Sequence, residues 1–148
     1  MANTSGFSVY LDNKLLDLLF NGTAYTTPSK YVALFSTDAG LSTNAPTGEL
    51  SGGGGYNRVK MEDSAFNAAA SGLITNKTEV TFPIATESWG TITHVGIMDA
   101  LTDGNVLAWA TITTPDGTQP MPKNITTADQ FVIRANGIKF SIRDSADL

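Results

Sequence analysis

Apolar residues near the start of the chain recur at helical spacing. Ser8 precedes this stretch and is a good N-cap, while Asn21-Gly22 follows it and supplies a left-handed stop. The pattern predicts one amphipathic helix between these signals. Its apolar positions are Leu11, Leu15, Leu16, Leu18, Leu19 and Phe20.

After Thr27 the pattern becomes that of β-strands. The run Tyr31–Phe35 is apolar throughout, which is typical of a strand buried on both faces. Residues 56–61 predict another strand, and residues 64–72 a short helix or a loop. Apolar and polar residues alternate over 80–84, where Pro83 lacks a donor; this strand should lie at a sheet edge or end there.

Two hairpins are predicted from turn signals. Residues 88–100 and 106–110 are strand-like and are joined by Asp103-Gly104. Residues 131–135 and 138–143 flank Asn136-Gly137, which is the strongest short hairpin signal. Gaps remain at residues 36–55 and 113–128, which we expect to be long loops, and at residues 1–7, which we expect to be a mobile arm.

These elements predict one mainly β domain over residues 1–148. The expected fold is an antiparallel β-sandwich or a barrel-like domain with one N-terminal amphipathic helix, and a chain of this length can bury its own core. The core candidates are Leu34, Phe35, Val80, Phe82, Val95, Ile97, Trp109, Phe140 and Ile142.

Composition narrows the partners. Only 16% of residues are charged, the net charge is −5 and there is no run of Lys and Arg, so we expect no nucleic-acid partner. The longest apolar runs fall far short of the ~20 residues that span a bilayer, so we expect no membrane association. The chain has no cysteine, which excludes disulfides and thiolate metal sites.

The search for chemistry finds no catalytic pattern. His94 is the only histidine, and its expected neighbours on the same strand face, Ile92 and Gly96, offer no catalytic partner; we expect a sheet histidine beside Trp89. Asp99, Asp103 and Asn105 lack the terminal glutamate of a calcium loop. The glycines Gly52, Gly53, Gly54 and Gly55 lack the Lys-Ser/Thr of a phosphate loop and suggest a hinge or a close backbone approach. We therefore expect neither enzymatic activity nor a cofactor or metal.

Several motifs together resemble a family of small virion proteins of tailed bacteriophages, whose members are described as tail-fibre-like, head-fibre or capsid cement proteins. The resemblance covers about residues 28–143, and its most specific part is the stretch from Trp89 to Ile97, with Gly90, His94 and Gly96. Its other anchors are Tyr31–Phe35, Glu49–Ser51 with the following glycines, Tyr56–Arg58, Val80–Pro83 and Gly104–Leu107. The resemblance implies a structural subunit of the virion, assembled in the host cytoplasm.

Three functions remain in view. We expect a capsid cement protein that binds the major capsid protein and forms a homo-oligomer, most simply a trimer. The alternatives are a small tail, tail-fibre or baseplate protein and, from another class, a carbohydrate-binding β-sandwich that would use Tyr31, Tyr56, Trp89 and Trp109. The candidate assembly contacts are Phe7, Tyr10, Leu41, Gly52, Gly53, Gly54, Gly55 and Met121.

Overall fold

Five strands form the largest sheet, and every pairing within it is antiparallel. The structure is a computed structural model that describes residues 5–142. The strand order is β1-β8-β7-β2-β3, which places β7 at the centre. In chain order the strands are β1 (Ser5–Phe7), β2 (Lys30–Phe35), β3 (Val59–Met61), β7 (His94–Met98) and β8 (Val106–Thr111).

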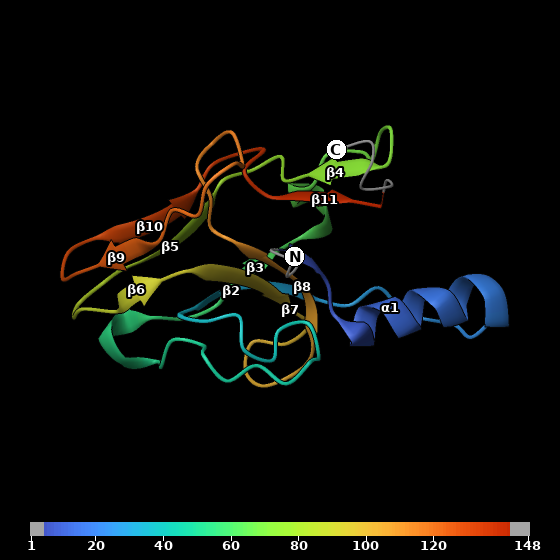
Figure 1. The fold of residues 1–148 in the computed structure, drawn as a ribbon, viewed down its shortest axis with the longest axis horizontal. Helices are drawn as coiled ribbons and strands as arrows, with labels where there is room; N and C mark the ends of the chain where they lie inside the picture. The colour runs from blue at the N-terminus through green and yellow to red at the C-terminus, as the bar shows by residue number, and fades with distance from the viewer. Residues whose placement is uncertain (1–4, 143–148) are drawn as a thin grey trace.

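Three smaller antiparallel sheets have two strands each. They pair β4 (Leu73–Thr75) with β11 (Lys139–Ser141), β5 (Val80–Ile84) with β10 (Gln130–Ile133), and β6 (Gly90–Ile92) with β9 (Lys123–Ile125). Figure 1 shows the β5–β10 and β4–β11 pairs on one side of the five-stranded sheet. The prediction of a mainly β, antiparallel fold with one N-terminal α-helix is confirmed, and the sheets do not close into a barrel.

The strand β2 is buried on both faces, as its apolar run predicted. Val32 and Leu34 belong to the larger core cluster, together with residues of the small sheets such as Phe82. Ala33 and Phe35 lie in a second cluster on the opposite side. Of the core candidates, those confirmed as buried are Leu34, Phe35, Val80, Phe82, Ile97 and Trp109.

The remaining core candidates lie nearer the surface. Val95 and Phe140 are partly buried and pack against the larger cluster. Ile142 is 79% exposed, so its assignment to the core is wrong. Strand β11 ends at Ser141, and Ile142 lies beyond the residues whose cross-strand partners on β4 hold them in place.

The predicted helix begins and ends at the expected signals. Ser8 accepts a hydrogen bond from the backbone N–H of Leu11 and caps α1 (Val9–Leu16). The helix continues as a π-helical turn, η1 (Asp17–Asn21), and stops at Gly22, whose φ is 68°. However, no residue of either segment is buried. The helix projects away from the sheets instead of packing its apolar stripe on them (Figure 1).

The first predicted hairpin is confirmed, with one change. Strands β7 and β8 pair across a turn in which both Asp103 and Gly104 have positive φ. Its first arm was expected to be one continuous strand, but β6 ends at Ile92 and pairs with β9, whereas β7 begins at His94 and pairs with β2. The chain therefore passes from one sheet to another at Thr93.

The second predicted hairpin is wrong. Asn136 and Gly137 do form a turn, but β10 pairs with β5 and β11 pairs with β4. The side chain of Asn76, which is fully buried, occupies the inside of this turn. It donates to the carbonyl of Arg134 and accepts from the N–H of Ile138, so the two strands diverge without losing their backbone hydrogen bonds at the turn.

Three loop predictions also change. The segment 113–128 contains β9, because β6 requires a partner for its backbone groups. Residues 5–7 of the expected mobile arm form β1 and pair with β8, while residues 1–4 lie outside the described residues. The segment 56–61 is a strand only from Val59, and 64–72 is mostly loop after the 3-10 turn η3 (Asp63–Ala65). Pro83 is confirmed on a strand with one neighbour, β10.

Candidate assembly site

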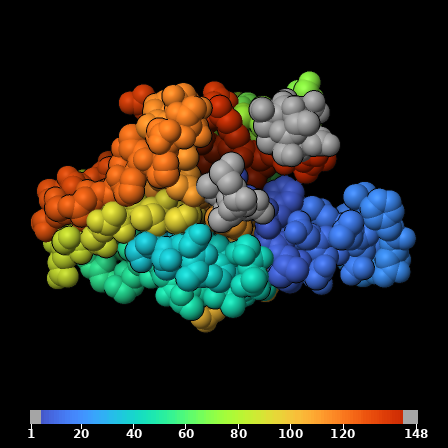
Figure 2. Space-filling model, in the orientation of Figure 1, coloured from blue at the N-terminus to red at the C-terminus, as the bar shows by residue number. Residues whose placement is uncertain are grey.

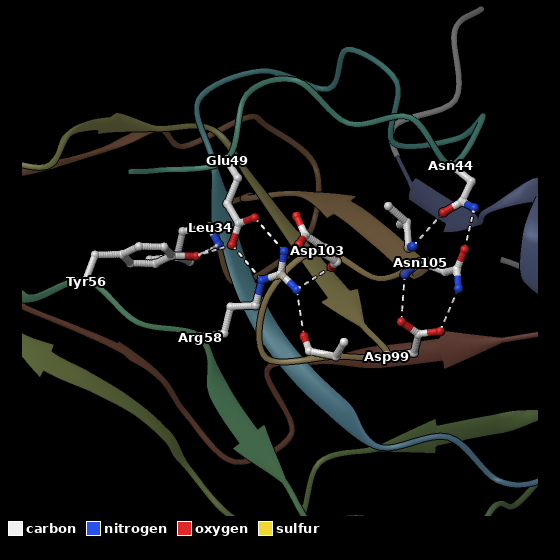
Figure 3. A network of polar contacts seen from close by, with 10 residues as sticks. Leu34, Asn44, Glu49, Tyr56, Arg58, Asp99, Asp103 and Asn105 are labelled. Atoms are coloured by element: carbon white, nitrogen blue, oxygen red, sulfur yellow. Dashed lines mark hydrogen bonds and ion pairs between the residues drawn. The ribbon is translucent and has the colours of Figure 1, made fainter. Parts of the chain in front are cut away.

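A buried ion pair fastens the segment after β2 to the sheet. The guanidinium of Arg58 donates from Nε and Nη2 to the two carboxylate oxygens of Glu49, over 2.7 and 2.6 Å. Its Nη1 donates to the backbone carbonyls of Ala100 and Asp103. These bonds raise the pKa of Arg58 and satisfy all three of its nitrogens, so one side chain joins the β7–β8 turn to Glu49 (Figure 3).

Tyr56 extends the same cluster into the core. Its hydroxyl donates to Glu49 Oε1 and accepts from the backbone N–H of Leu34, both over 3.0 Å. Burial raises the pKa of Tyr56 above its ordinary value, and the neighbouring Glu49 carboxylate acts in the same direction. The phenol therefore stays neutral and acts as a hydrogen-bonding post between strand β2 and Glu49.

The glycine run is held by Trp89. The indole N–H donates to the carbonyl of Gly54 over 2.8 Å. A Cβ on Gly54 would lie 3.0 Å from the indole ring, and its φ is 64°. The expected close backbone approach is thus confirmed at Gly54, which lies in the 3-10 turn η2 (Gly53–Gly55).

A second polar group fastens the tip of the 36–48 loop. Asp99 accepts from the backbone and the side-chain amide of Asn105, over 2.6 and 2.8 Å. Asn44 donates to Asn105 Oδ1 over 2.9 Å and accepts from the N–H of Val106 (Figure 3). The two carboxylates, Glu49 and Asp99, are thus each occupied by hydrogen bonds that hold loops in place.

The remaining motif residues have packing roles. His94 lies beside Trp109, with 6.2 Å between ring centroids, so the expectation of a neighbouring Trp89 is wrong. The reason is the sheet change at Thr93, which separates His94 from Trp89. Gly96 leaves room for the ring of Phe35, which a Cβ would approach to 2.7 Å, and Gly90 has a φ of 81°.

The aromatic residues offered for glycan binding are mostly in the core. Trp89, Trp109 and Tyr56 are 9%, 7% and 4% exposed, respectively. Tyr31 is partly buried and packs against the second core cluster. A sugar ring needs exposed aromatic faces, so these side chains form no carbohydrate platform.

The predicted contact residues are not gathered in one place. Leu41 is fully buried in the second core cluster, so its assignment as a surface contact is wrong: it packs the 36–48 loop onto the sheet. Phe7 and Tyr10 are partly buried against the larger cluster. Met121 is partly exposed, and of the glycines only Gly54 is partly covered.

The exposed apolar surface lies elsewhere, on the projecting helical segment. Its far end carries four large apolar side chains that contact solvent. Their exposed fractions are 54% for Leu16, 42% for Leu18, 71% for Leu19 and 83% for Phe20. We call α1, η1 and the returning residues 22–29 the arm, and these four side chains the arm tip. Sequence periodicity identified these residues as an apolar stripe but could not show that the stripe is left uncovered.

The arm is anchored firmly at its base. Ser8 is fully buried and its hydroxyl donates to the carbonyl of Val106 on β8. The N–H of Val9 donates to the carbonyl of Ser42 over 2.8 Å. Strand β1, immediately before, pairs with β8. The arm is therefore a fixed projection of the domain and not a loose tail (Figure 2).

Within residues 5–142 no cluster of three or more His, Cys, Asp or Glu side chains could hold a metal ion. None of the helices in that range has the length and apolar character needed to cross a membrane.

Comparison with known proteins gives one finding. The family model described as podophage GP4 fiber I protein gp80 matches residues 6–141. The match includes the arm, the ion pair, the Trp89 latch and the sheets. No curated protein matches the chain.

Proposed function

Since the chain belongs to the podophage GP4 fiber I protein family, and is therefore a fibre-like structural component of a phage virion, we propose that it works without catalysis as a subunit of a fibre on the particle surface. The observation that carries this proposal is the family match over nearly the whole described fold. The polar clusters support it, because Glu49, Arg58, Asp99 and Asn105 spend their hydrogen bonds on holding loops in place.

A capsid cement protein is the second candidate. It is supported by the weakly charged composition and by an anchored arm whose apolar tip could reach a neighbouring subunit. In this case the partner is the major capsid protein, and a symmetric oligomer, most simply a trimer, binds the head lattice. Binding only to the assembled shell would stabilise it by mass action, and many weak contacts would add up.

Imaging of the virion separates the two candidates. We would compare particles that carry the wild-type protein with particles that carry a version enlarged by a fused fluorescent protein. Extra density on tail or fibre structures would support the fibre proposal. Extra density distributed over the head lattice would overturn it in favour of cement, and absence of the protein from purified particles would contradict both.

Heat resistance of the head gives an independent measurement. Particles that lack the protein are heated, with and without added purified protein, and the temperature of genome release is recorded. A fibre subunit should leave this temperature unchanged. A cement protein should raise it as protein is added, because its binding energy stabilises the intact shell relative to its parts.

A further inference from the structure

The arm tip is apolar around its circumference. Leu16, Leu18, Leu19 and Phe20 fall within five consecutive positions, and a helix has only about 3.6 residues per turn, so they cannot all point to one side. A helix that is apolar on one side lies on a flat surface, whereas one that is apolar all round is normally enclosed. The tip therefore requires a partner with a concavity.

The same chain offers an apolar groove between β4–β11 and the turn η3. Its volume is about 310 Å³, and it is lined by Phe66, Ile74 and Phe140, with Lys30 and Asp63 beside them. The Lys30 ammonium lies 2.6 Å from Asp63 and lowers the pKa of that carboxyl, so the polar side of the groove is a fixed ion pair. The groove is thus an apolar concavity with a charged border.

The arm tip of one copy cannot enter the groove of its own chain without losing the anchor at Ser8. Lys30, which borders the groove, begins β2 at the end of the arm's returning segment. The groove is therefore near the base of the arm, while the tip lies at the opposite end (Figure 1). A second copy can bring its tip to this groove, and its own groove then remains available to another.

We propose that the arm tip of one copy inserts into the groove of the next copy, head to tail, and that these contacts close into a ring. The proposal deepens the proposed function, on which it rests, by naming a second copy of this chain as the partner of the arm. Tip and groove are different surfaces, so the contact is heterologous, and such contacts form rings when the rotation closes.

Size and charge agree with this arrangement. One inserted tip is small beside the ~800 Å² that each partner buries in a standard interface. In a closed ring each subunit makes two such contacts, and all must break for a subunit to leave. Asp17 lies within the tip sequence and Lys30 borders the groove, so the two surfaces bring charges of opposite sign together.

The experiment uses two variants that each disable one half of the contact. The double variant Leu19→Ser/Phe20→Ser removes the tip and keeps the groove. The variant Ile74→Glu places a charge in the groove and keeps the tip; Ile74 is partly exposed and does not belong to either core cluster. The control Leu101→Ser removes an apolar side chain that is 53% exposed and lies in neither surface. Circular dichroism and the melting temperature confirm that each variant is folded.

Native mass spectrometry and light scattering, over a concentration series, then give the oligomeric state. We expect wild type and Leu101→Ser to form the same ring, and each disabled variant to be monomeric. An equimolar mixture of the two disabled variants should form a heterodimer, because one intact tip and one intact groove remain. This rescue is specific to a head-to-tail contact, since arm-to-arm packing would fail whenever one arm lacks its tip.

Three results would overturn the proposal: a monomeric wild type at the highest concentration, a mixture that stays monomeric, or loss of the ring in the control. These outcomes are distinct from a failure of the proposed function. A ring in solution from a protein that proves to lie on the head lattice keeps the arm contact and removes the fibre, and a monomer located on a fibre does the reverse.

Discussion

At the residue scale, Arg58 is the side chain on which most polar contacts converge. Its side chain is 5% exposed and binds Glu49 and two backbone carbonyls. Replacing it by Met leaves Glu49 and the carbonyls without their donor, and removing one partner of a buried pair costs about 3 kcal/mol or more. We expect Arg58→Met to lower the free energy of unfolding by that amount in urea denaturation.

The matched control is the ion pair between Lys60 and Glu62. It has a similar length, 2.9 Å, but its side chains are 48% and 67% exposed. Lys60→Met should therefore change the free energy of unfolding by less than about 1 kcal/mol. Equal losses in the two variants would mean that burial of Arg58 contributes nothing.

His94 should make stability depend on pH. Burial lowers its pKa below the ordinary value, against a weaker opposing effect of Asp38. The unfolded chain then takes up a proton at higher pH than the folded one, so stability is complete above about pH 6.5 and declines as the pH falls below it. In His94→Gln this part of the decline should disappear.

The measurement is the melting temperature of both proteins at about pH 7.5 and about pH 5.5. Carboxylates titrate equally in both proteins, so the comparison isolates the histidine. If wild type and His94→Gln lose the same number of degrees, the imidazole is not coupled to folding.

At the scale of elements, the glycine run is one turn with two different ends. Gly54→Ala would place a methyl group 3.0 Å from the Trp89 ring at a φ of 64°. A non-glycine residue in this backbone region costs about 1–2 kcal/mol before any contact is counted. We expect Gly54→Ala to lower the free energy of unfolding by about 1–3 kcal/mol and to change Trp89 fluorescence.

Gly52, two positions earlier, provides the control. Its φ is −69°, and no atom lies within 4 Å of the place where its Cβ would be. Gly52→Ala should be neutral or stabilise the fold by up to about 1 kcal/mol through the unfolded chain. A loss as large as that of Gly54→Ala would show that the whole run, and not the Trp89 contact, requires glycine.

At the scale of the whole molecule, the sheets and the arm should respond differently to loss of a phenylalanine. Phe82 is 1% exposed and contacts the rings of Tyr56 and Phe131 in the core. Phe82→Ala should lower the free energy of unfolding by about 3–5 kcal/mol. Phe20→Ala removes the same group from a side chain that is 83% exposed, and should change it by no more than about 0.5 kcal/mol in dilute protein.

Chemical denaturation of the two variants under identical conditions checks this contrast. A loss below about 1 kcal/mol for Phe82→Ala would be incompatible with a buried side chain. A large loss for Phe20→Ala in dilute protein would mean that the arm tip packs on its own domain, which would also remove the basis for head-to-tail assembly.

Local signals in the sequence were sufficient for most single elements. Ser8 and Gly22 bound the helix because a cap and a left-handed stop act on the adjacent backbone alone. The apolar run of β2 and the Asp103-Gly104 turn were likewise read correctly, since burial on both faces and positive φ leave a direct mark on residue type. The virion family was also visible in the motif around Trp89.

Only the tertiary structure decided which elements meet. Asn136-Gly137 makes a turn in either case, but Asn76, about sixty positions earlier in the chain, separates the strands on its two sides. Glu49 and Arg58 were read as motif residues, and their pairing with the β7–β8 turn depends on a contact across the sheet. The apolar stripe of the helix predicts burial but not the partner. Periodicity records what a side chain avoids, whereas long-range packing determines what covers it, and here the described fold leaves the arm tip uncovered.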